Sequence, residues 1–585
     1  MGCRQLWAGL GGAILMACGG DSGGPTPPPP PPPPPAATTC SSVTPVQLSV
    51  GEHQVIDPAG TSGCVRVPAA GASGAEYAVV IAATTGIRSS AGVSGAYFVR
   101  TSNPAASVVA GAPPAAPVAS TPTLGVGGKG FPVEPRLGRG PVPAAFDRML
   151  REREAALAAD PANRSRPPSG PERAPAAGPP AVGDVRTFKT CKNVTCSAFD
   201  SVAATARFVG TKAAIYMDNN VPTADTLRDV DYQDLGRTFD TYHYPIDRAA
   251  FGAESDLDQN DRIIILMTKS VNNLTPDCTN GRVLGYFFGL DLITTGAQAV
   301  NSNKGEIFYT FVPAPATATC TATSRSQAIG AIKPTLIHEL QHMISWNQRV
   351  ILGSGQAEET WLNEAMSHFA EELGGRQIPN AECVGFNSCR SQYISGDIIN
   401  TYDYLKDTES NFLIYPISSN GSLEERGASW NFLRWVIDQF ATDTLLGGDL
   451  TPRLVTGPGG AGTFNALTGQ SFSTLVTEWL LAAYLDDRPG FTPLSDRLRF
   501  KSWGLRAIYE NPLNASIFPT GFPLRPDSTS GAYTRSGTLR GGSGRHFRLI
   551  QAANGAAIDF QVLKDSAGNG LDPALVARIG IARVR

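Results

Sequence analysis

The stretch that decides the fold is Thr335-Leu336-Ile337-His338-Glu339-Leu340-Gln341-His342-Met343-Ile344. The preceding Pro334 favours a helix start, and the leucines and isoleucines give the segment an apolar face. On a helix, residues four positions apart are neighbours at about 6 Å, so His338 and His342 would project side by side. Neutral imidazoles are preferred zinc ligands. The spacing therefore predicts a helix that presents two imidazoles to one Zn²⁺ ion.

Glu339 follows the first histidine and completes the pattern H-E-x-x-H, in which the glutamate acts as general base on a metal-bound water. The pattern alone also arises by chance, on a helix that carries two unrelated histidines. A third ligand on a second helix would favour the metal site over that alternative.

A second helix is predicted around Trp361-Leu362-Asn363-Glu364-Ala365-Met366-Ser367-His368, where apolar residues recur at helical spacing. Glu364 is flanked by apolar residues, as a buried ligand would be, and would complete the His₂Glu set of catalytic zinc sites. His368, one turn later, is a candidate to hydrogen-bond a ligand or to pack at the edge of the site. The other acids weighed on this helix are Glu358, Glu359, Glu371 and Glu372.

The two segments resemble the gluzincin clan of metallopeptidases and, within it, the bacterial hyicolysin family. The segment 427–435 resembles the helix that follows the zinc helices in that family. The resemblance covers roughly residues 183–490 and implies a zincin-like catalytic domain that hydrolyses peptide bonds. It departs from the clan in two places. Glu424 stands where the aminopeptidases carry a tyrosine, and His368 stands where thermolysin-like enzymes carry an acid.

By analogy with zincins, the strand Glu306–Thr310 is expected to be an edge strand that pairs with extended substrate. Four tyrosines are candidates to stabilise the oxyanion, although core or surface packing is the preferred explanation of each. These candidates are Tyr309, Tyr402, Tyr404 and Tyr415.

The first residues predict export. Arg4 is followed by a short apolar run that ends in Leu15-Met16-Ala17-Cys18, which resembles a bacterial lipobox. The run is shorter than the roughly 20 residues of a membrane-spanning helix. Cleavage before Cys18 and lipidation of its thiol would anchor the protein to the cell envelope. A plain secretory signal with an incidental cysteine is the alternative.

Eight further cysteines favour disulfides, because an even number in an exported chain is typical of them. Pairing between neighbours along the chain is expected, and a zinc–cysteine cluster is disfavoured because no C-x-x-C pair occurs. The expected pairs are Cys40 with Cys64, Cys191 with Cys196, Cys278 with Cys320, and Cys383 with Cys389.

Composition shifts divide the chain. The fold class is α+β, because apolar strands at 213–217, 263–267 and 306–311 precede helical periodicity at 335–349, 358–373, 428–440 and 472–485. A short amphipathic helix is expected before them, at 144–159. Small β-sandwich-like domains are expected to flank the catalytic domain. The expected parts are a signal peptide (1–17), a lipid anchor and polyproline tether (18–39), an N-terminal β domain (40–125), a Pro/Ala-rich linker with a short helix (126–182), the metallopeptidase domain (183–505) and a C-terminal β domain (506–585).

A run of acidic and amide residues at 256–261 could bind Ca²⁺ through alternating oxygens. It lacks the glycine and the glutamate of a complete calcium loop, so a polar turn before a strand is the preferred interpretation.

The net charge of −3 gives no reason to expect a nucleic-acid partner. The expected partners are a protein or peptide substrate and a membrane reached through the N-terminal lipid. The alternatives are a non-catalytic surface adhesin or scaffold, and a zinc hydrolase that acts on a non-peptide bond. An intact Glu339 argues against the scaffold, which needs no base beside the metal.

Overall fold

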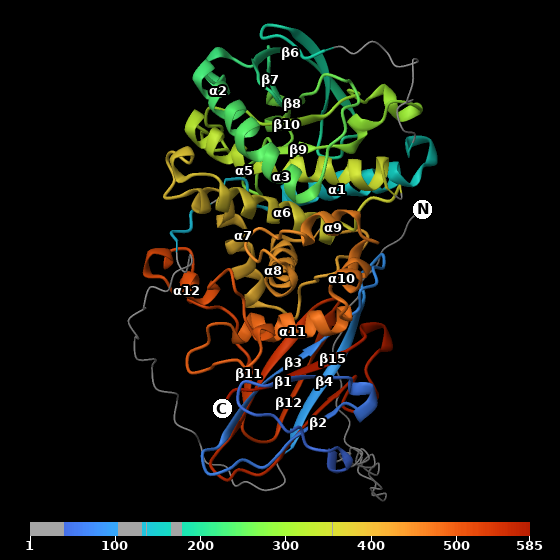
Figure 1. Ribbon diagram of the computed structural model, residues 1–585, viewed down its shortest axis with the longest axis vertical. Coiled ribbons are helices and arrows are strands. Elements are labelled where there is room, and N and C mark those ends of the chain that lie inside the picture. The colour runs from blue at the N-terminus through green and yellow to red at the C-terminus, as the bar shows by residue number, and fades with distance from the viewer. Residues whose placement is uncertain (1–39, 103–130, 136, 165–177, 354, 420) are drawn as a thin grey trace, which may run out of the picture. The chain divides into compact units, whose positions relative to one another are not determined.

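The computed structural model describes residues 40–102, 131–135, 137–164, 178–353, 355–419 and 421–585. The predicted signal peptide, Cys18 and the polyproline tether lie outside these residues. The described chain combines helices and sheets, which confirms the α+β class (Figure 1). None of its described helices has the length and apolar character needed to cross a membrane.

One mixed sheet lies beside the H-E-x-x-H helix. Its strands run in the order β5 (Val185–Cys191), β6 (Phe199–Val209), β7 (Ala213–Asp218), β8 (Ile263–Met267), β10 (Ile307–Thr310) and β9 (Gly285–Phe287). The central strands β7, β8 and β10 are parallel, and β9 is antiparallel to β10. The central strands are buried along their whole length, which explains their nearly continuous apolar sequences.

The strand at the edge of this sheet differs from the one that was predicted. The strand expected at 306–310 lies between β8 and β9, so the prediction of an edge strand there is wrong. Among the described strands, the three-residue β9 forms that edge. So short a strand has no periodic signal, and its position depends on pairing between residues distant in sequence.

The H-E-x-x-H helix is longer than predicted. Helix α5 spans Arg325–Trp346 and starts at a capping box formed by Ser324 and Gln327, so Pro334 lies inside it. A proline cannot donate to the carbonyl four residues earlier, which here is that of Gly330. Gln392 Nε2 donates to this carbonyl at 3.0 Å and replaces the missing bond.

The helices around α5 form the core of the central region. They include α6 (Thr360–Gln377), α7 (Cys389–Lys406), α8 (Leu423–Phe440) and α11 (Phe472–Leu485). The shorter helices are α2 (Asp229–Thr238), α3 (Tyr244–Phe251), α4 (Lys269–Asn273), α9 (Leu450–Thr456), α10 (Gly460–Thr468) and α12 (Leu505–Tyr509). The apolar periodicities at 335–349, 358–373, 428–440 and 472–485 thus correspond to helices α5, α6, α8 and α11.

The two terminal β segments pair with each other. One sheet has the order β1 (His53–Ile56), β15 (Arg578–Arg583), β3 (Ala75–Ala82), β13 (Gly544–Gln551) and β11 (Asp527–Thr529). The other has the order β12 (Tyr533–Arg540), β4 (Ser94–Ser102), β14 (Ile558–Leu563) and β2 (Cys64–Val67). Side chains from both sheets share one apolar core. The expectation of two separate β domains is therefore corrected to one sandwich built from both segments, whose pairing between distant residues leaves no local trace in the sequence.

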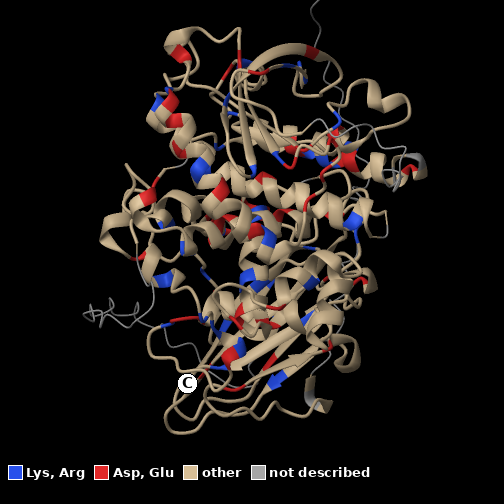
Figure 2. Cartoon of the chain, turned by 45° about the horizontal axis from the view of Figure 1, so that its top comes forward, with Lys and Arg blue, Asp and Glu red and all other residues tan. Residues whose placement is uncertain are grey.

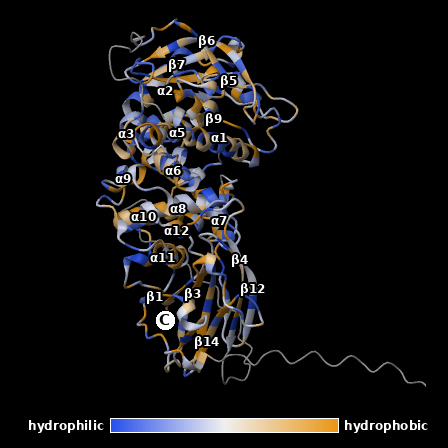
Figure 3. Cartoon of the chain, turned by 90° about the vertical axis from the view of Figure 1, so that its right-hand side faces the viewer, coloured by the Kyte–Doolittle hydropathy of each residue, from blue (hydrophilic) through white to orange (hydrophobic). Residues whose placement is uncertain are grey.

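The helix expected at 144–159 exists as α1 (Pro141–Ala159). Its surroundings correct the expectation of a linker, because Phe146 and Leu150 are fully buried. In Figures 1 and 3, α1 lies beside β9, between the mixed sheet and α6.

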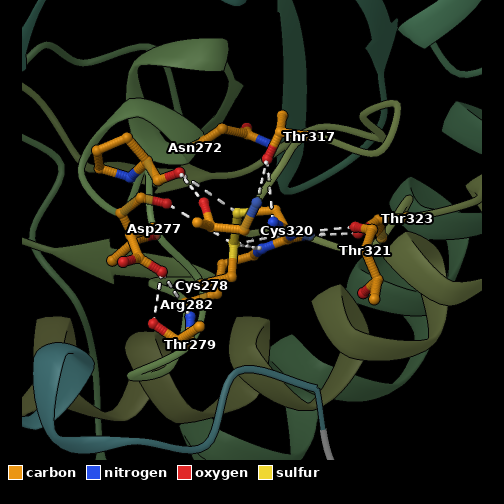
Figure 4. Close-up of a disulfide and its surroundings, with 12 residues drawn as sticks. Asn272, Asp277, Cys278, Thr279, Arg282, Thr317, Cys320, Thr321 and Thr323 are labelled. Atoms are coloured by element: carbon orange, nitrogen blue, oxygen red, sulfur yellow. Dashed lines mark hydrogen bonds between the residues drawn. A yellow bond between two sulfur atoms is a disulfide. The ribbon is translucent and has the colours of Figure 1, made fainter.

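The four expected cysteine pairs are joined as disulfides. Cys278–Cys320 links the segment before β9 to the segment after β10, and Thr317, Thr321 and Thr323 surround it (Figure 4). Basic and acidic residues are interspersed along the described chain, in keeping with its small net charge (Figure 2).

Candidate metal centre

Helices α5 and α6 bring together His338, His342 and Glu364, which we call the His–His–Glu cluster. His338 Nε2 lies 3.8 Å from Glu364 Oε2, and His342 Nε2 lies 3.8 Å from Glu364 Oε1. The rings of the two histidines are 4.9 Å apart. The three residues thus converge from two helices, as the sequence predicted they would if they bound one metal ion.

The donor set fits Zn²⁺. Tetrahedral zinc with ordinary bond lengths separates its nitrogen and oxygen ligands by about 3.4 Å, close to the observed spacing. Glu364 Oε2 is buried and accepts no hydrogen bond within the described chain, but the Arg426 guanidinium lies 3.3 Å from it. Because that cation already compensates part of the buried charge, the fit to Zn²⁺ rests on the identity and the spacing of the three donors.

Glu371 and His368 both contact His338 of the cluster; the His368 ring meets the His338 ring edge-on with the centroids 4.9 Å apart. Glu371 Oε1 lies 2.9 Å from His338 Nδ1, the nitrogen that faces away from Glu364. A carboxylate in this position fixes the orientation of a ligating imidazole. The sequence analysis weighed Glu371 only as an alternative ligand, although its spacing of two helical turns from Glu364 places it on the same face of α6.

His368 contacts carboxylates of two helices. Its Nδ1 is 2.8 Å from Asp397 Oδ1 on α7 and 3.2 Å from Glu371 Oε1. Burial opposes the charged imidazole, but the carboxylates of Asp397 and Glu371 outweigh it and raise the pKa of His368 to about 10. A charged His368 balances the two neighbouring carboxylates, and it reaches the cluster both through Glu371 and through its ring contact with His338.

His342 is held by α6. Ser367 Oγ lies 3.1 Å from His342 Nδ1 and donates to Gln341 Oε1 at 2.6 Å. Burial lowers the pKa of His342 well below its ordinary value, with a further contribution from Arg151. The ring is therefore neutral, the form that binds a metal ion.

Glu339, the acid of the H-E-x-x-H pattern, lines the same cavity as His338. Its Oε2 accepts a hydrogen bond of 2.9 Å from the backbone amide of Phe287 on β9. Burial raises the pKa of Glu339 well above its ordinary value, although Arg151 partly opposes the shift. A carboxyl group with a raised pKa is suited to accept and return a proton.

Arg426 on α8 is a part of the site that the sequence analysis missed. Its Nη1 lies 3.3 Å from Glu364 Oε2, and its Nη2 lies 3.1 Å from Asp147 on α1. Burial would raise the pKa of Glu364, but the charges of Arg426, His338 and His368 together outweigh it and the pKa is lowered. No motif identifies an arginine that reaches the site from a distant helix.

The other acids on and before α6 are engaged elsewhere. Glu358 pairs with Arg349 at 3.2 Å, and Glu359 accepts a bond from Trp361 Nε1 at 2.7 Å. Glu372 pairs with Arg434 at 3.2 Å inside the helical core.

The candidate tyrosines have partners away from the cluster. Tyr309 donates to Asp291 at 2.6 Å, and the Tyr402 hydroxyl bonds that of Thr520 at 2.7 Å. Tyr404 stacks on Trp479, and Tyr415 bonds Ser429. None of these hydrogen bonds and ring contacts reaches the His–His–Glu cluster in the described structure.

The acidic turn at 256–261 places Asp256 and Asp258 near Glu306 of the neighbouring strand segment. Asp258 contacts Arg186 at 3.3 Å, and Glu306 accepts bonds from Ser255 and the Leu257 amide. These contacts account for the acidic groups as parts of a polar turn, and calcium binding remains an untested alternative.

Comparisons with known proteins give limited support. No protein-family model matches the chain. The neutral metalloprotease ShpI of Staphylococcus hyicus is 24% identical over 234 residues, which are 40% of this chain and 50% of that protein. The chain thus spans about half the length of the curated relative that it matches. A solved M1 zinc metallopeptidase from Deinococcus radiodurans has a TM-score of 0.26 and 13% identity, over 51% of this chain and 61% of that chain. The sequence similarity relates part of the chain to a metalloprotease, and it does not single out the hyicolysin family.

Proposed function

We propose that this chain is a zinc-dependent peptidase of the gluzincin type, related to the hyicolysin family. The observation that carries the proposal is the convergence of His338, His342 and Glu364 on a helix pair that also carries Glu339, the acid of the H-E-x-x-H pattern. The similarity to a metalloprotease supports the same activity.

His338, His342 and Glu364 would hold the metal. Bound zinc lowers the pKa of a coordinated water to about 7 and polarises a substrate carbonyl. Glu339 takes a proton from the attacking water and passes it to the leaving nitrogen. Glu371 and Ser367 keep the two imidazoles in place for this work.

The substrates are proposed to be proteins or peptides outside the cytoplasm. The lipobox-like start predicts a lipid-anchored protein of the bacterial cell envelope, and the disulfides suit an oxidising compartment. The alternatives are a surface scaffold with an inactive metal domain and a zinc hydrolase of non-peptide bonds.

The test combines metal analysis with digestion of casein and a peptide library, with and without a chelator. We expect one zinc per chain and chelator-sensitive cleavage, and we expect Glu339→Gln to keep its zinc while losing activity by at least about 100-fold. Cleavage of esters but not peptides would favour the non-peptide hydrolase. A zinc-loaded chain that cleaves nothing, alone or with the α1 variants described below, would favour the scaffold.

Glu364 is tested separately. Glu364→Ala should lower the affinity for zinc by more than about 100-fold, because the loss of a ligand exceeds the loss of an outer partner. Glu359→Ala, at the start of the same helix, is the matched control and should keep its zinc. Equal zinc occupancy in both variants would exclude Glu364 as a ligand.

A further inference from the structure

Helix α1 is attached directly to the candidate active site. Asp147 pairs with Arg426 at 3.1 Å, and Arg426 also contacts Glu364. One turn later, Arg151 Nη2 donates to the Phe287 carbonyl at 3.0 Å. These contacts place two charged residues of α1 beside the proposed ligand and general base.

Further along α1, Glu154 accepts a hydrogen bond of 2.7 Å from the Gly289 amide, just past the end of β9. On the apolar side of the helix, Phe146 and Leu150 are fully buried, and the Phe146 ring meets Tyr286 of β9 edge-on at 5.1 Å. Helix α1 therefore covers β9 with both polar and apolar contacts.

The strand under α1 is the edge of the mixed sheet, where an extended peptide could add its main chain. At Phe287 both backbone groups are already occupied, the amide by Glu339 and the carbonyl by Arg151. Of these two groups α1 occupies only the carbonyl, so while α1 is in place a peptide cannot donate a hydrogen bond to the Phe287 carbonyl.

The space left at the site is small. The cavity that reaches His338 and Glu339 is also lined by Pro143 and Asp147, and its volume is about 140 Å³. Sites for small molecules usually measure about 300–1,000 Å³, and a peptide needs a longer groove. The side chain of His338 is 12% exposed and that of Glu364 is 1% exposed. Residues of α1 thus occupy part of the space beside His338 and Glu339 in this conformation.

We infer that α1 is an internal inhibitor that fills the substrate groove, so the chain in this conformation is latent and becomes active when α1 leaves β9. This inference rests on the proposed peptidase function. The alternative is that α1 is a permanent part of the active site. In that case, loosening α1 would lower the activity instead of raising it.

The test loosens α1 in the full chain at Glu154, which also pairs with Arg151 at 2.7 Å. Glu154→Gln weakens the bond to the Gly289 amide, and Glu152→Gln makes the same change at an exposed position of the same helix. With a fluorogenic peptide, we expect kcat/KM to rise about tenfold in Glu154→Gln and to stay unchanged in Glu152→Gln, because a hydrogen bond to a charged group shifts a two-state equilibrium by about that factor. An unchanged or lower kcat/KM in Glu154→Gln, at equal zinc content and melting temperature, would overturn the inference.

A second variant, Phe146→Ala/Leu150→Ala, removes the apolar anchor and should activate the enzyme further. A synthetic peptide with the sequence of residues 141–159, added to this variant, should restore inhibition in a concentration-dependent manner. If the variant is folded and zinc-loaded but no more active than wild type, α1 is not an inhibitor.

The rate at which a chelator removes zinc separates this inference from the proposed function. Faster removal from Glu154→Gln than from Glu152→Gln, with no hydrolysis in any variant, would support α1 as a cover of the cluster and refute the peptidase. Equal hydrolysis and equal removal rates in wild type and in all α1 variants would refute the cover and leave the peptidase standing.

Discussion

His338 is held on two sides, with Nε2 facing the Glu364 carboxylate and Nδ1 facing Glu371. A neutral imidazole that donates from Nδ1 must present the lone pair of Nε2 to the metal. The side chain of Glu371 is 3% exposed, so this contact is shielded from water. The tautomer of His338 is therefore set by a residue on the neighbouring helix.

We expect Glu371→Gln to lower zinc affinity by about 10–100-fold, which is the usual cost of losing such a partner. Competition with a chelator of known affinity measures the change. Glu359→Gln, at the N-cap of the same helix, is the control and should bind zinc like the wild type. If zinc affinity is unchanged in Glu371→Gln, the contact with His338 does not position the ligand.

At the scale of elements, α5 depends on a bond supplied by another helix. Pro334 leaves the Gly330 carbonyl without its helical donor, and Gln392 on α7 replaces it. The side chain of Gln392 is buried. This contact allows the H-E-x-x-H helix to run through a proline without an unsatisfied carbonyl.

Gln392→Ala should therefore lower the free energy of unfolding by about 1–3 kcal/mol, the cost of leaving a buried carbonyl unpaired. Urea unfolding measures the effect, and Gln470→Ala, at an exposed position, should change stability by less than about 0.5 kcal/mol. A Gln392→Ala protein as stable as this control would mean that water or a shift of the helix satisfies Gly330.

Helices and strands could be predicted from the sequence where their pattern of apolar residues is local. Apolar periodicity is local, and it located helices α6, α8 and α11 with small errors at their ends. The start of α5 was predicted too late because a proline is typical of the first turn of a helix. Only the side chain of Gln392, which donates to the Gly330 carbonyl, explains how Pro334 can lie inside the helix. The edge strand β9 was missed because three residues carry no period.

The same limit applies to the site. The spacing of His338 and His342 is a property of one helix, and Glu364 is flanked by residues of its own apolar stripe. Arg426 and the contacts of α1 come from segments far away in sequence. Nothing in either segment alone indicates that they meet, so the ligands were predictable and their electrostatic partners were not.

At the scale of the whole described chain, the sandwich joins residues that are hundreds of positions apart. Strand β3 pairs with β13 and β15, so the segments before and after the metal-binding region fold into one unit. His546 on β13 connects this sandwich to the helices. Its Nε2 lies 2.9 Å from the Leu480 carbonyl on α11, and its Nδ1 lies 3.3 Å from Thr408 Oγ1.

This connection makes the stability of the protein depend on pH. Burial lowers the pKa of His546 to about 4; the Leu480 carbonyl opposes the shift, and Arg545 adds to it. The unfolded chain binds the proton with a pKa of about 6.5. Because the folded pKa is the lower one, the contribution is fully present above about pH 6.5 and is lost as the pH falls towards 4. At pH 5 the loss is about 2 kcal/mol.

We therefore expect the difference in unfolding free energy between wild type and His546→Gln to shrink by about 2 kcal/mol between pH 7 and pH 5. Urea unfolding at the two pH values measures it, and the buried carboxylates of the rest of the chain cancel because both proteins share them. The same difference at both pH values would show that His546 becomes protonated without leaving its place between β13 and α11. In that case water or a small local movement would solvate the charged imidazole, and the contact between β13 and α11 would be more adaptable than its buried hydrogen bonds imply.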